Sequence, residues 1–97
     1  MKLSADAIAV ELSKLNDWQV QNDRLVRLFT FSDFVEAFGF MTRVALCAER
    51  AEHHPDWSNS YRTVEISLTT HSEGSITRKD INLALEIDKL YQPLYSS

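Results

Sequence analysis

The sequence has little of the material from which disulfides, linkers and membrane spans are built. Its 97 residues include one cysteine, two glycines and two prolines. Cys47 has no partner for an internal disulfide, which is typical of a protein in a reducing compartment. No apolar run approaches the length of a membrane span, and Met1–Asp6 lacks the apolar stretch of a secretory signal. We therefore expect a single domain over residues 1–97, located in the cytoplasm.

Clustered positive charge is also absent. Ten Lys and Arg residues stand against fourteen Asp and Glu residues, for a net charge of −4. The longest cationic run is Arg78-Lys79, whereas a surface that binds nucleic-acid phosphates needs clustered cations. A glycine-rich phosphate-binding loop is missing as well. These absences argue against direct nucleic-acid binding, and the remaining composition is that of an ordinary globular domain.

Hydrophobic periodicity predicts three helices and four strands. In chain order these are a helix over 4–15, strands over 18–21 and 25–31, a helix over 34–52, a turn and short strand over 56–61, a strand over 63–69, and a helix from 77 to about 91. Two hairpins that flank a long helix are best satisfied by one antiparallel sheet. The predicted fold class is α+β, a two-layer domain of order α-β-β-α-β-β-α. Its four-stranded antiparallel sheet carries three helices on one face.

Short polar motifs mark where these elements begin and turn. Asn22-Asp23 is a turn signal between the first two strands. Ser4 is a plausible cap for the first helix, and Asp33 has capping-box spacing to Glu36 at the second. Thr77 caps the last helix, with Asp80 at the third helical position.

Apolar residues cover an unusually wide face of the long helix: Phe34, Val35, Phe38, Phe40, Met41, Val44, Ala45 and Cys47. Such a face predicts burial on two sides, against the sheet and against a partner subunit. For the cluster Phe38–Met41 we expect core packing rather than contact with a ligand. Cys47 lies on the apolar side of the helix, where a buried and inert thiol is the usual case.

The chain has only three histidines, the side chains best suited to acid–base chemistry near neutral pH. His53 and His54 follow the long helix directly and precede Pro55, and His71 continues the polar parity of the strand over 63–69. A free imidazole has a pKa of about 6.5. Neighbouring residues of an extended chain point to opposite sides, so His53 and His54 face one pocket only if the chain bends between them.

By themselves the histidines admit three interpretations. The first is a solvated helix exit with no chemical role. The second is a zinc site of three histidines, although their spacing is not the helical i, i+4 pair and no cysteine assists. The third is a proton-transfer site in which Glu49 or Glu52 holds one ring in a single tautomer.

A wider pattern around the histidines resembles the signature of the pterin-4a-carbinolamine dehydratase family. In that signature an acidic residue precedes His-His-Pro, and an aromatic residue, a third histidine and an aspartate follow. The matching positions are Glu49, His53, His54, Pro55, Tyr61, His71 and Asp80. Residues 37–46 also resemble the animal branch of the family, and the similarity runs from Trp18 to about Leu90. Gly74-Ser75 departs from many members, which have a second glycine there.

The resemblance implies the same element order and a hydro-lyase that needs no cofactor and no metal. Such an enzyme removes water from a 4a-hydroxytetrahydropterin, giving quinonoid dihydropterin in tetrahydrobiopterin recycling. His53, His54 and His71 would be the catalytic and pterin-binding set, with His53 and His71 as proton donors and His54 as the base. The further pterin-binding positions are Trp18, Pro55, Thr70, Ser72 and Glu73, and those in supporting roles are Asp80, Glu49 and Tyr61.

Two of these assignments have a structural alternative. Asp80 would either orient a histidine or serve only as a carboxylate at a helix start. Trp18 would either stack on the pterin or pack in the core. Thr70 is expected to pair with the pterin edge through its backbone amide and carbonyl.

The resemblance also implies partners. Family members are dimers or tetramers, formed by sheet extension and helix packing, so a homodimer or homotetramer is expected. Some animal members also act as dimerisation cofactors of a homeodomain transcription factor, which would add a nuclear location. Zinc binding remains the third alternative, beside the enzyme and the coactivator.

Overall fold

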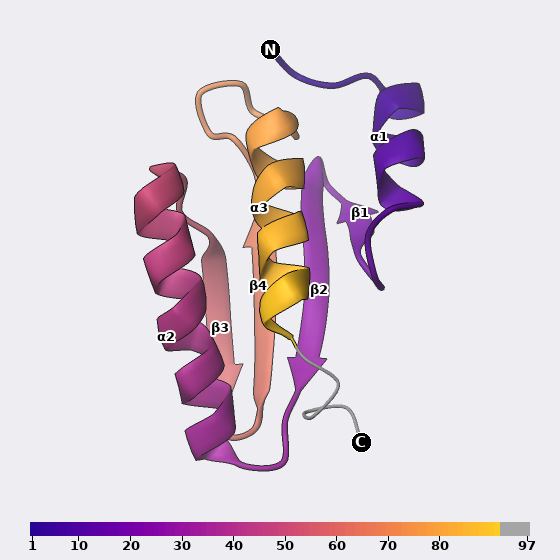
Figure 1. Ribbon diagram of the computed structural model, residues 1–97. Coiled ribbons are helices and arrows are strands. Elements are labelled where there is room, and N and C mark those ends of the chain that lie inside the picture. Colours follow the sequence, from indigo (N-terminus) through magenta and orange to yellow (C-terminus); the bar gives the residue numbers. More distant parts are fainter. Residues whose placement is uncertain (92–97) are drawn as a thin grey trace.

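The computed structural model describes residues 1–91, which form three helices and four strands in the predicted order (Figure 1). The elements are α1 (Ala5–Leu12), β1 (Gln19–Gln21), β2 (Arg24–Thr30), α2 (Phe34–Ala51), β3 (Asp56–Ser60), β4 (Thr63–Leu68) and α3 (Arg78–Leu90). No helix in this part of the chain is long and apolar enough to cross a membrane.

The four strands form one antiparallel sheet in the order β1-β2-β4-β3. Alternation along the strands places Leu25 and Phe29 of β2 on the same face as the apolar residues of β4, where Phe29 pairs with Val64 and Leu25 pairs with Leu68. These side chains are fully buried. Helices α2 and α3 lie across this face (Figure 1). The predicted two-layer α+β fold is therefore confirmed.

The first hairpin turns through two residues in the left-handed region. Asn22 has φ 51° and Asp23 has φ 61°, and the register pairs Gln21 with Arg24. A two-residue hairpin turn with two positive φ angles matches the twist of the strands, and Asn and Asp tolerate that conformation. The turn predicted at Asn22-Asp23 is confirmed.

Helix α1 begins as predicted but ends three residues earlier. The Ser4 hydroxyl accepts a hydrogen bond from the Ala7 amide, which confirms the cap. The predicted end at residue 15 is wrong, because the chain tightens after Leu12. There the Leu15 amide donates to the Leu12 carbonyl, an i→i+3 bond of the kind that closes helices. Leu15 stays buried although it lies outside the helix.

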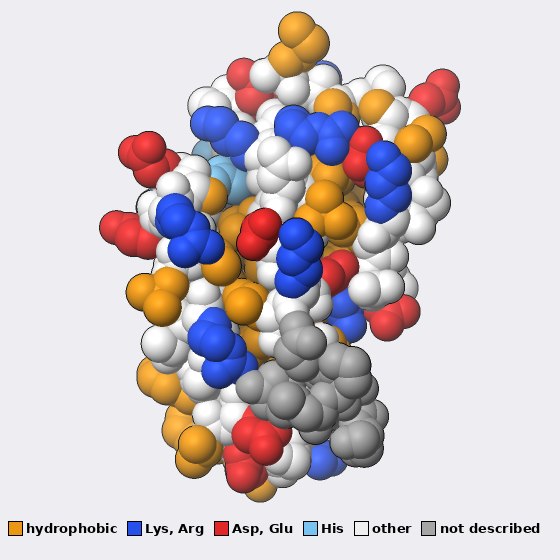
Figure 2. Space-filling view, in the orientation of Figure 1, with side chains coloured by type: hydrophobic (Ala, Val, Ile, Leu, Met, Phe, Trp, Pro, Cys, Tyr) orange, Lys and Arg blue, Asp and Glu red, His pale blue; other side chains and the backbone are white. Residues whose placement is uncertain are grey.

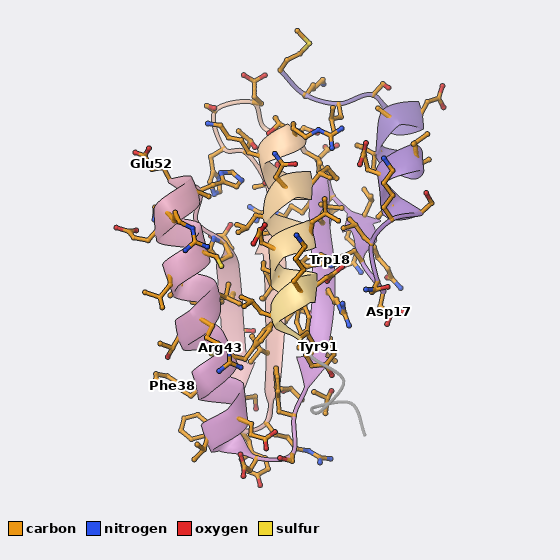
Figure 3. The ribbon with its side chains drawn as sticks, in the orientation of Figure 1. Asp17, Trp18, Phe38, Arg43, Glu52 and Tyr91 are labelled. Atoms are coloured by element: carbon orange, nitrogen blue, oxygen red, sulfur yellow. The ribbon has the colours of Figure 1, made fainter. Side chains whose placement is uncertain are left out.

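Helix α2 has one buried face and one exposed apolar face. The buried face consists of Ala37, Phe40, Val44, Cys47 and Ala48. Phe34, Val35, Phe38 and Leu46 are exposed, and Figure 2 shows apolar side chains gathered along the outer side of this helix. Core packing was expected for the cluster Phe38–Met41. It is correct for Phe40 and wrong for Phe38, which is 55% exposed and points away from the sheet (Figure 3).

Polar contacts attach α1 to α3. The Arg78 guanidinium donates to Oε2 of Glu11 at 2.8 Å. This hydrogen bond holds the pKa of the Glu11 carboxyl below its usual range, and in turn raises the pKa of Arg78. The pair fixes α1 beside the first turn of α3, close to where the predicted site residues gather.

Candidate active site

The predicted site residues lie on segments that meet at one end of the sheet. His53 and His54 connect α2 to β3, and His71 follows β4. Because β3 and β4 are antiparallel, the start of β3 lies beside the end of β4, where Asp56 pairs with Ser67. Helix α3 also begins at this end (Figure 1). The topology thus brings together residues that are up to 31 positions apart in the sequence, from Glu49 to Asp80.

His53 is turned inward by the end of α2. Glu52, the residue before it, adopts a left-handed conformation with φ 53°, and the His53 amide donates to the Ala48 carbonyl. This arrangement is a common way to end a helix. It directs the imidazole toward α3, where His53 Nε2 lies 2.5 Å from Oδ1 of Asp80. The His53 side chain is 11% exposed and that of Asp80 is fully buried.

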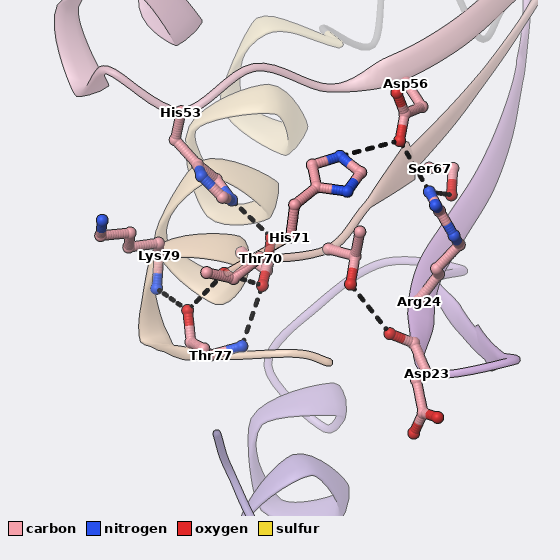
Figure 4. A network of polar contacts seen from close by, with 11 residues as sticks. Asp23, Arg24, His53, Asp56, Ser67, Thr70, His71, Thr77 and Lys79 are labelled. Atoms are coloured by element: carbon pink, nitrogen blue, oxygen red, sulfur yellow. Dashed lines mark hydrogen bonds and ion pairs between the residues drawn. The ribbon is translucent and has the colours of Figure 1, made fainter. Parts of the chain in front are cut away.

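Asp80 uses both carboxylate oxygens as hydrogen-bond acceptors. Its Oδ2 accepts from the Thr70 hydroxyl at 2.8 Å and from the Thr77 amide at 2.9 Å, which completes the predicted capping box (Figure 4). The two donors at Oδ2 use this carboxylate oxygen as an acceptor, which is the ordinary role of an aspartate side chain. The imidazole of His53 then donates from Nε2 and keeps Nδ1 for another partner. The two interpretations of Asp80 are therefore compatible, because one residue makes both contacts.

A second imidazole–carboxylate pair lies on the other side of the site. His71 Nε2 is 3.4 Å from Oδ2 of Asp56, and the same oxygen accepts from Arg24 Nη1 at 2.7 Å. Arg24 also donates to the Ser67 hydroxyl at 3.3 Å. Figure 4 shows this chain of contacts running from the loop after β4 across to β2. Arg24 and Asp56 were not predicted as site residues, and no local sequence signal marks them.

The Arg24 contact has a measurable electrostatic consequence. The hydrogen bond and charge of Arg24, with a smaller effect of His71, hold the pKa of Asp56 below its ordinary value of 3.8. Ionised Asp56 therefore stabilises the fold above that value, and this contribution is lost as the pH falls through the lowered pKa. The pair is largely solvent-exposed, so the contribution to stability is small.

We expect Arg24→Gln to return the pKa of Asp56 toward its ordinary value. An NMR titration that follows the Asp56 side-chain carboxyl carbon in both proteins measures the change. Lys14→Gln removes a cation that pairs with Glu11 and serves as the control. In this variant the pKa of Asp56 should stay as in the wild type. Equal Asp56 titrations in wild type and Arg24→Gln would contradict the assigned cause.

His54 lies on the other side of the chain from His53. Its Nε2 is 2.7 Å from Oε1 of Glu49, one turn back on α2, and both side chains are mostly exposed. Glu49 therefore holds the ring of His54, whereas Asp80 holds that of His53. The structure brings His53 and Asp80 into contact and leaves His54 at the outer rim.

Three hollows surround this end of the sheet. The first, of about 310 Å³, lies between α2 and α3 and includes His53, Lys79 and Asn82. A histidine side chain is visible between these helices in Figure 2. The second, of about 300 Å³, includes Thr70, Ser72 and Glu73, with Lys79 on its border as well. The third, of about 400 Å³, includes Glu49, His54 and Pro55. Six of the predicted pterin-binding residues therefore line these hollows: His53, His54, Pro55, Thr70, Ser72 and Glu73.

Two predicted pterin contacts differ from the structure. Trp18 is 6% exposed, packs edge-on against Phe29, and donates from its indole nitrogen to Asp88, two turns of α3 beyond Asp80 (Figure 3). This placement favours core packing over stacking. The Thr70 backbone is also engaged: its amide donates to Ser75, and its carbonyl accepts from Glu73 and Gly74. Because the turn already uses both groups, the structure argues against the expected backbone pairing with a pterin edge.

Comparison with known proteins places this arrangement in a family. The sequence profile described as "Pterin 4 alpha carbinolamine dehydratase" matches residues 1–90. The chain belongs to this family. As a pterin-4a-carbinolamine dehydratase family member, it is a hydro-lyase with a dehydratase role.

Bacterial relatives cover nearly the whole chain. A Mesorhizobium japonicum protein provisionally named pterin-4-alpha-carbinolamine dehydratase is 50% identical over 92 residues, which span 93% of this chain and 94% of that protein. A Bradyrhizobium protein of the same provisional name is 53% identical over 91 residues, spanning 92% of this chain and 91% of that protein. The resemblance drawn from the histidine pattern is confirmed.

Two solved structures share the fold. A transcriptional coactivator/pterin dehydratase from Brucella melitensis superposes with a TM-score of 0.92 at 37% identity, covering 95% of this chain and all of that one. A pterin dehydratase-like protein, identified as a RuBisCO assembly factor in the alpha-carboxysome, has a TM-score of 0.64 at 20% identity, covering 76% and 86% of the two chains. The second comparison supports the fold alone.

The remaining positions of the dehydratase signature have different places in the structure. Tyr61 lies in the turn between β3 and β4, has φ 51°, and is 65% exposed. That turn is at the opposite end of β3 from His53, so Tyr61 is not part of the site. Cys47 is buried and accepts a weak hydrogen bond from Arg50. In residues 1–91, no three histidine, cysteine or acidic side chains converge as potential ligands of one metal ion.

Proposed function

We propose that this chain removes water from a 4a-hydroxytetrahydropterin in tetrahydrobiopterin recycling, by acid–base catalysis with histidines. The observation that carries the proposal is the pair formed by His53 and fully buried Asp80 at the edge of a hollow of about 310 Å³. A carboxylate that accepts from one imidazole nitrogen fixes the tautomer and leaves the other nitrogen for proton transfer. Family membership supplies the reaction class, and this geometry supplies a group suited to it.

The reaction moves two protons. The hydroxyl on C4a leaves as water after it receives a proton, and the N5–H proton is lost as the C4a=N5 double bond forms. The products are water and quinonoid dihydropterin. Positioned acid–base groups typically accelerate such steps by about 10²–10⁴-fold.

In this proposal His53 donates the proton that the leaving hydroxyl receives. His71 approaches the same hydroxyl from its own side of the site. His53 is held by Asp80 and His71 by Asp56, so both rings present Nδ1. His54, held by Glu49, would contact the pterin from the rim and accept the N5 proton. Pro55, Ser72 and Glu73 border the adjoining hollows and would enclose the substrate.

The direct test is a dehydratase assay on the purified chain. Addition of the protein should accelerate the loss of the absorbance of freshly generated 4a-hydroxytetrahydropterin above its spontaneous rate. A chelator added to the same assay should leave the rate unchanged if the three histidines act without zinc. A rate equal to that without protein, from a correctly folded sample, would remove the proposed function.

We also propose that the exposed face of α2 packs against a second copy of the chain. Phe34, Val35, Phe38 and Leu46 form an apolar surface on one helix, of the kind that monomers seldom leave open. The Brucella neighbour carries the name of a transcriptional coactivator, and such a partner would compete for the same surface. Cys47, without a disulfide partner in the chain, supports the cytoplasm as the proposed compartment.

The oligomer is tested by sedimentation. We expect the wild type to sediment as a dimer or tetramer and Phe38→Glu to dissociate toward the 11.2 kDa chain, because a charge at this position opposes apolar contact. Lys14→Gln, in the turn after α1, is the control and should not change the oligomer. A wild-type protein that sediments as an 11.2 kDa monomer at micromolar concentration would contradict the proposal.

A further inference from the structure

The Thr70 hydroxyl occupies a buried position between two other polar side chains. It lies 2.8 Å from Oδ2 of Asp80 and 2.7 Å from the Thr77 hydroxyl, and Thr70 is 6% exposed. Figure 4 shows Thr70 and Thr77 in one connected network of polar contacts that also includes His53. The sequence gives no reason to expect this contact, because Thr70 and Asp80 belong to different elements.

The direction of each hydrogen bond in this network follows from counting protons. An ionised Asp80 has no proton to give, so the Thr70 hydroxyl donates to Oδ2. The single proton of Thr70 is then used, so the Thr77 hydroxyl must donate to Thr70. The Thr77 oxygen in turn accepts from the Lys79 amide at 3.2 Å. Each group in the network therefore donates to the next: the Lys79 amide to Thr77, the Thr77 hydroxyl to Thr70, and the Thr70 hydroxyl to Asp80.

The backbone of the same residue closes the turn that carries His71. The Thr70 carbonyl accepts from the amides of Glu73 and Gly74, and its own amide donates to Ser75. Gly74 has φ 64°, which glycine adopts without strain. One residue thus engages Asp80 through its side chain and holds the His71 turn through its main chain.

We propose that Thr70 is a positioning residue for both imidazoles rather than a residue that binds the pterin. Its hydroxyl keeps Asp80 an acceptor toward His53, and its peptide groups fix His71 relative to that pair. The expected effect of Thr70 on catalysis rests on the proposed function. Its expected effect on the His53 ring does not, because that contact exists in the free protein.

The variants Thr70→Val and Thr70→Ser separate the hydroxyl from the rest of the side chain. Valine keeps the shape and removes the donor, so one oxygen of Asp80 loses a charge-assisted hydrogen bond. We expect kcat to fall roughly 10- to 100-fold with KM nearly unchanged. Thr70→Ser keeps the donor and should restore most of kcat.

Thr69→Val is the matched control. Thr69 is the adjacent threonine, equally buried, and its hydroxyl donates to the Asp23 carbonyl outside the network. Its replacement removes one part-buried hydrogen bond and should leave kcat and KM as in the wild type. If Thr69→Val lowers kcat as much as Thr70→Val, the effect is one of stability and the inference fails.

A double-variant comparison tests whether Thr70 acts through Asp80. In an Asp80→Asn background, Thr70→Val should cause little further loss, because the group that it acts on has already changed. If the losses of kcat in the two single variants instead multiply in the double variant, Thr70 acts independently of Asp80 and the inference is overturned. An increase in KM alone in Thr70→Val would show direct contact with substrate and would also overturn it.

The free protein provides a readout that does not depend on activity. Long-range ¹H–¹⁵N spectra of the imidazoles should show His53 with its proton on Nε2 in the wild type and in Thr70→Ser. In Thr70→Val we expect a mixture of tautomers. Unchanged His53 signals in Thr70→Val would overturn the inference even if the enzyme is active. The expected spectral change in a protein without dehydratase activity would leave the inference standing and remove only the proposed function.

Discussion

Replacement of His53 by glutamine is expected to lower kcat/KM for dehydration by about 10²–10⁴-fold, the range typical of a lost acid–base group. The side-chain amide of glutamine places a donor close to the position of Nε2, so the hydrogen bond to Asp80 has a substitute. What glutamine lacks is a group that gains and loses a proton near neutral pH. Initial rates from the loss of 4a-hydroxypterin absorbance measure the change.

His54→Gln is the variant with which His53→Gln is compared. The two histidines are adjacent, and each contacts one carboxylate, but His54 is mostly exposed whereas the His53 side chain is 11% exposed and lies against Asp80. We expect a smaller loss of kcat/KM for His54→Gln than for His53→Gln. Thermal unfolding monitored by circular dichroism should show both variants folded. A folded His53→Gln variant with wild-type kcat/KM would exclude His53 as the proton donor.

The parts of the fold that could be predicted from the sequence depend on neighbours in the chain. The turn at Asn22-Asp23 is marked by residues that tolerate positive φ. The strand β4 is marked by strict alternation, and the start of α3 by the capping box of Thr77 and Asp80. Each of these signals lies within a few residues, where backbone geometry alone sets the outcome.

The parts that could not be predicted depend on residues far apart in the sequence or on a second chain. The apolar width of α2 predicted two buried sides, but periodicity does not tell which side faces the sheet, so Phe38 was assigned to the core. Asp56 was missed because its partners, Arg24 and His71, come from two other segments. The spacing of the histidine signature identified the family, whereas only the structure shows that Asp80 contacts His53 and that Glu49 contacts His54.

A large effect on the stability of the fold is expected at the opposite end of α3 from the active site. Asp88 is 8% exposed and accepts three hydrogen bonds: Oδ1 from Arg27 at 2.8 Å and from the Trp18 indole at 2.7 Å, and Oδ2 from the Asn16 amide at 3.0 Å. Arg27 is itself 7% exposed. This carboxylate joins α3 to β2 and to the segment after α1, so it fixes the position of the helix that carries Asp80.

Asp88→Asn is expected to lower the free energy of unfolding by about 3–5 kcal/mol, because a buried guanidinium loses its close counter-charge. The remaining acidic neighbour, Asp17, is 3.9 Å from Arg27 and mostly exposed, so it compensates little. Urea unfolding followed by circular dichroism measures the change. Lys89→Gln removes one member of an exposed ion pair on the same helix, and its effect should stay below about 1 kcal/mol.

A double variant tests whether the cost comes from the unpaired charge. Arg27→Met with Asp88→Leu removes both charges, so it should destabilise the protein less than Asp88→Asn alone. A loss equal to or greater than that of Asp88→Asn would instead assign the stability to the hydrogen bonds of Trp18 and Asn16. In either case Asp88→Asn should retain dehydratase activity below its unfolding temperature, because Asp88 lies two turns from Asp80 on α3 and contacts neither histidine pair. Loss of activity in a fully folded Asp88→Asn variant would mean that the position of α3, and with it the contact between Asp80 and His53, depends on this distant pair.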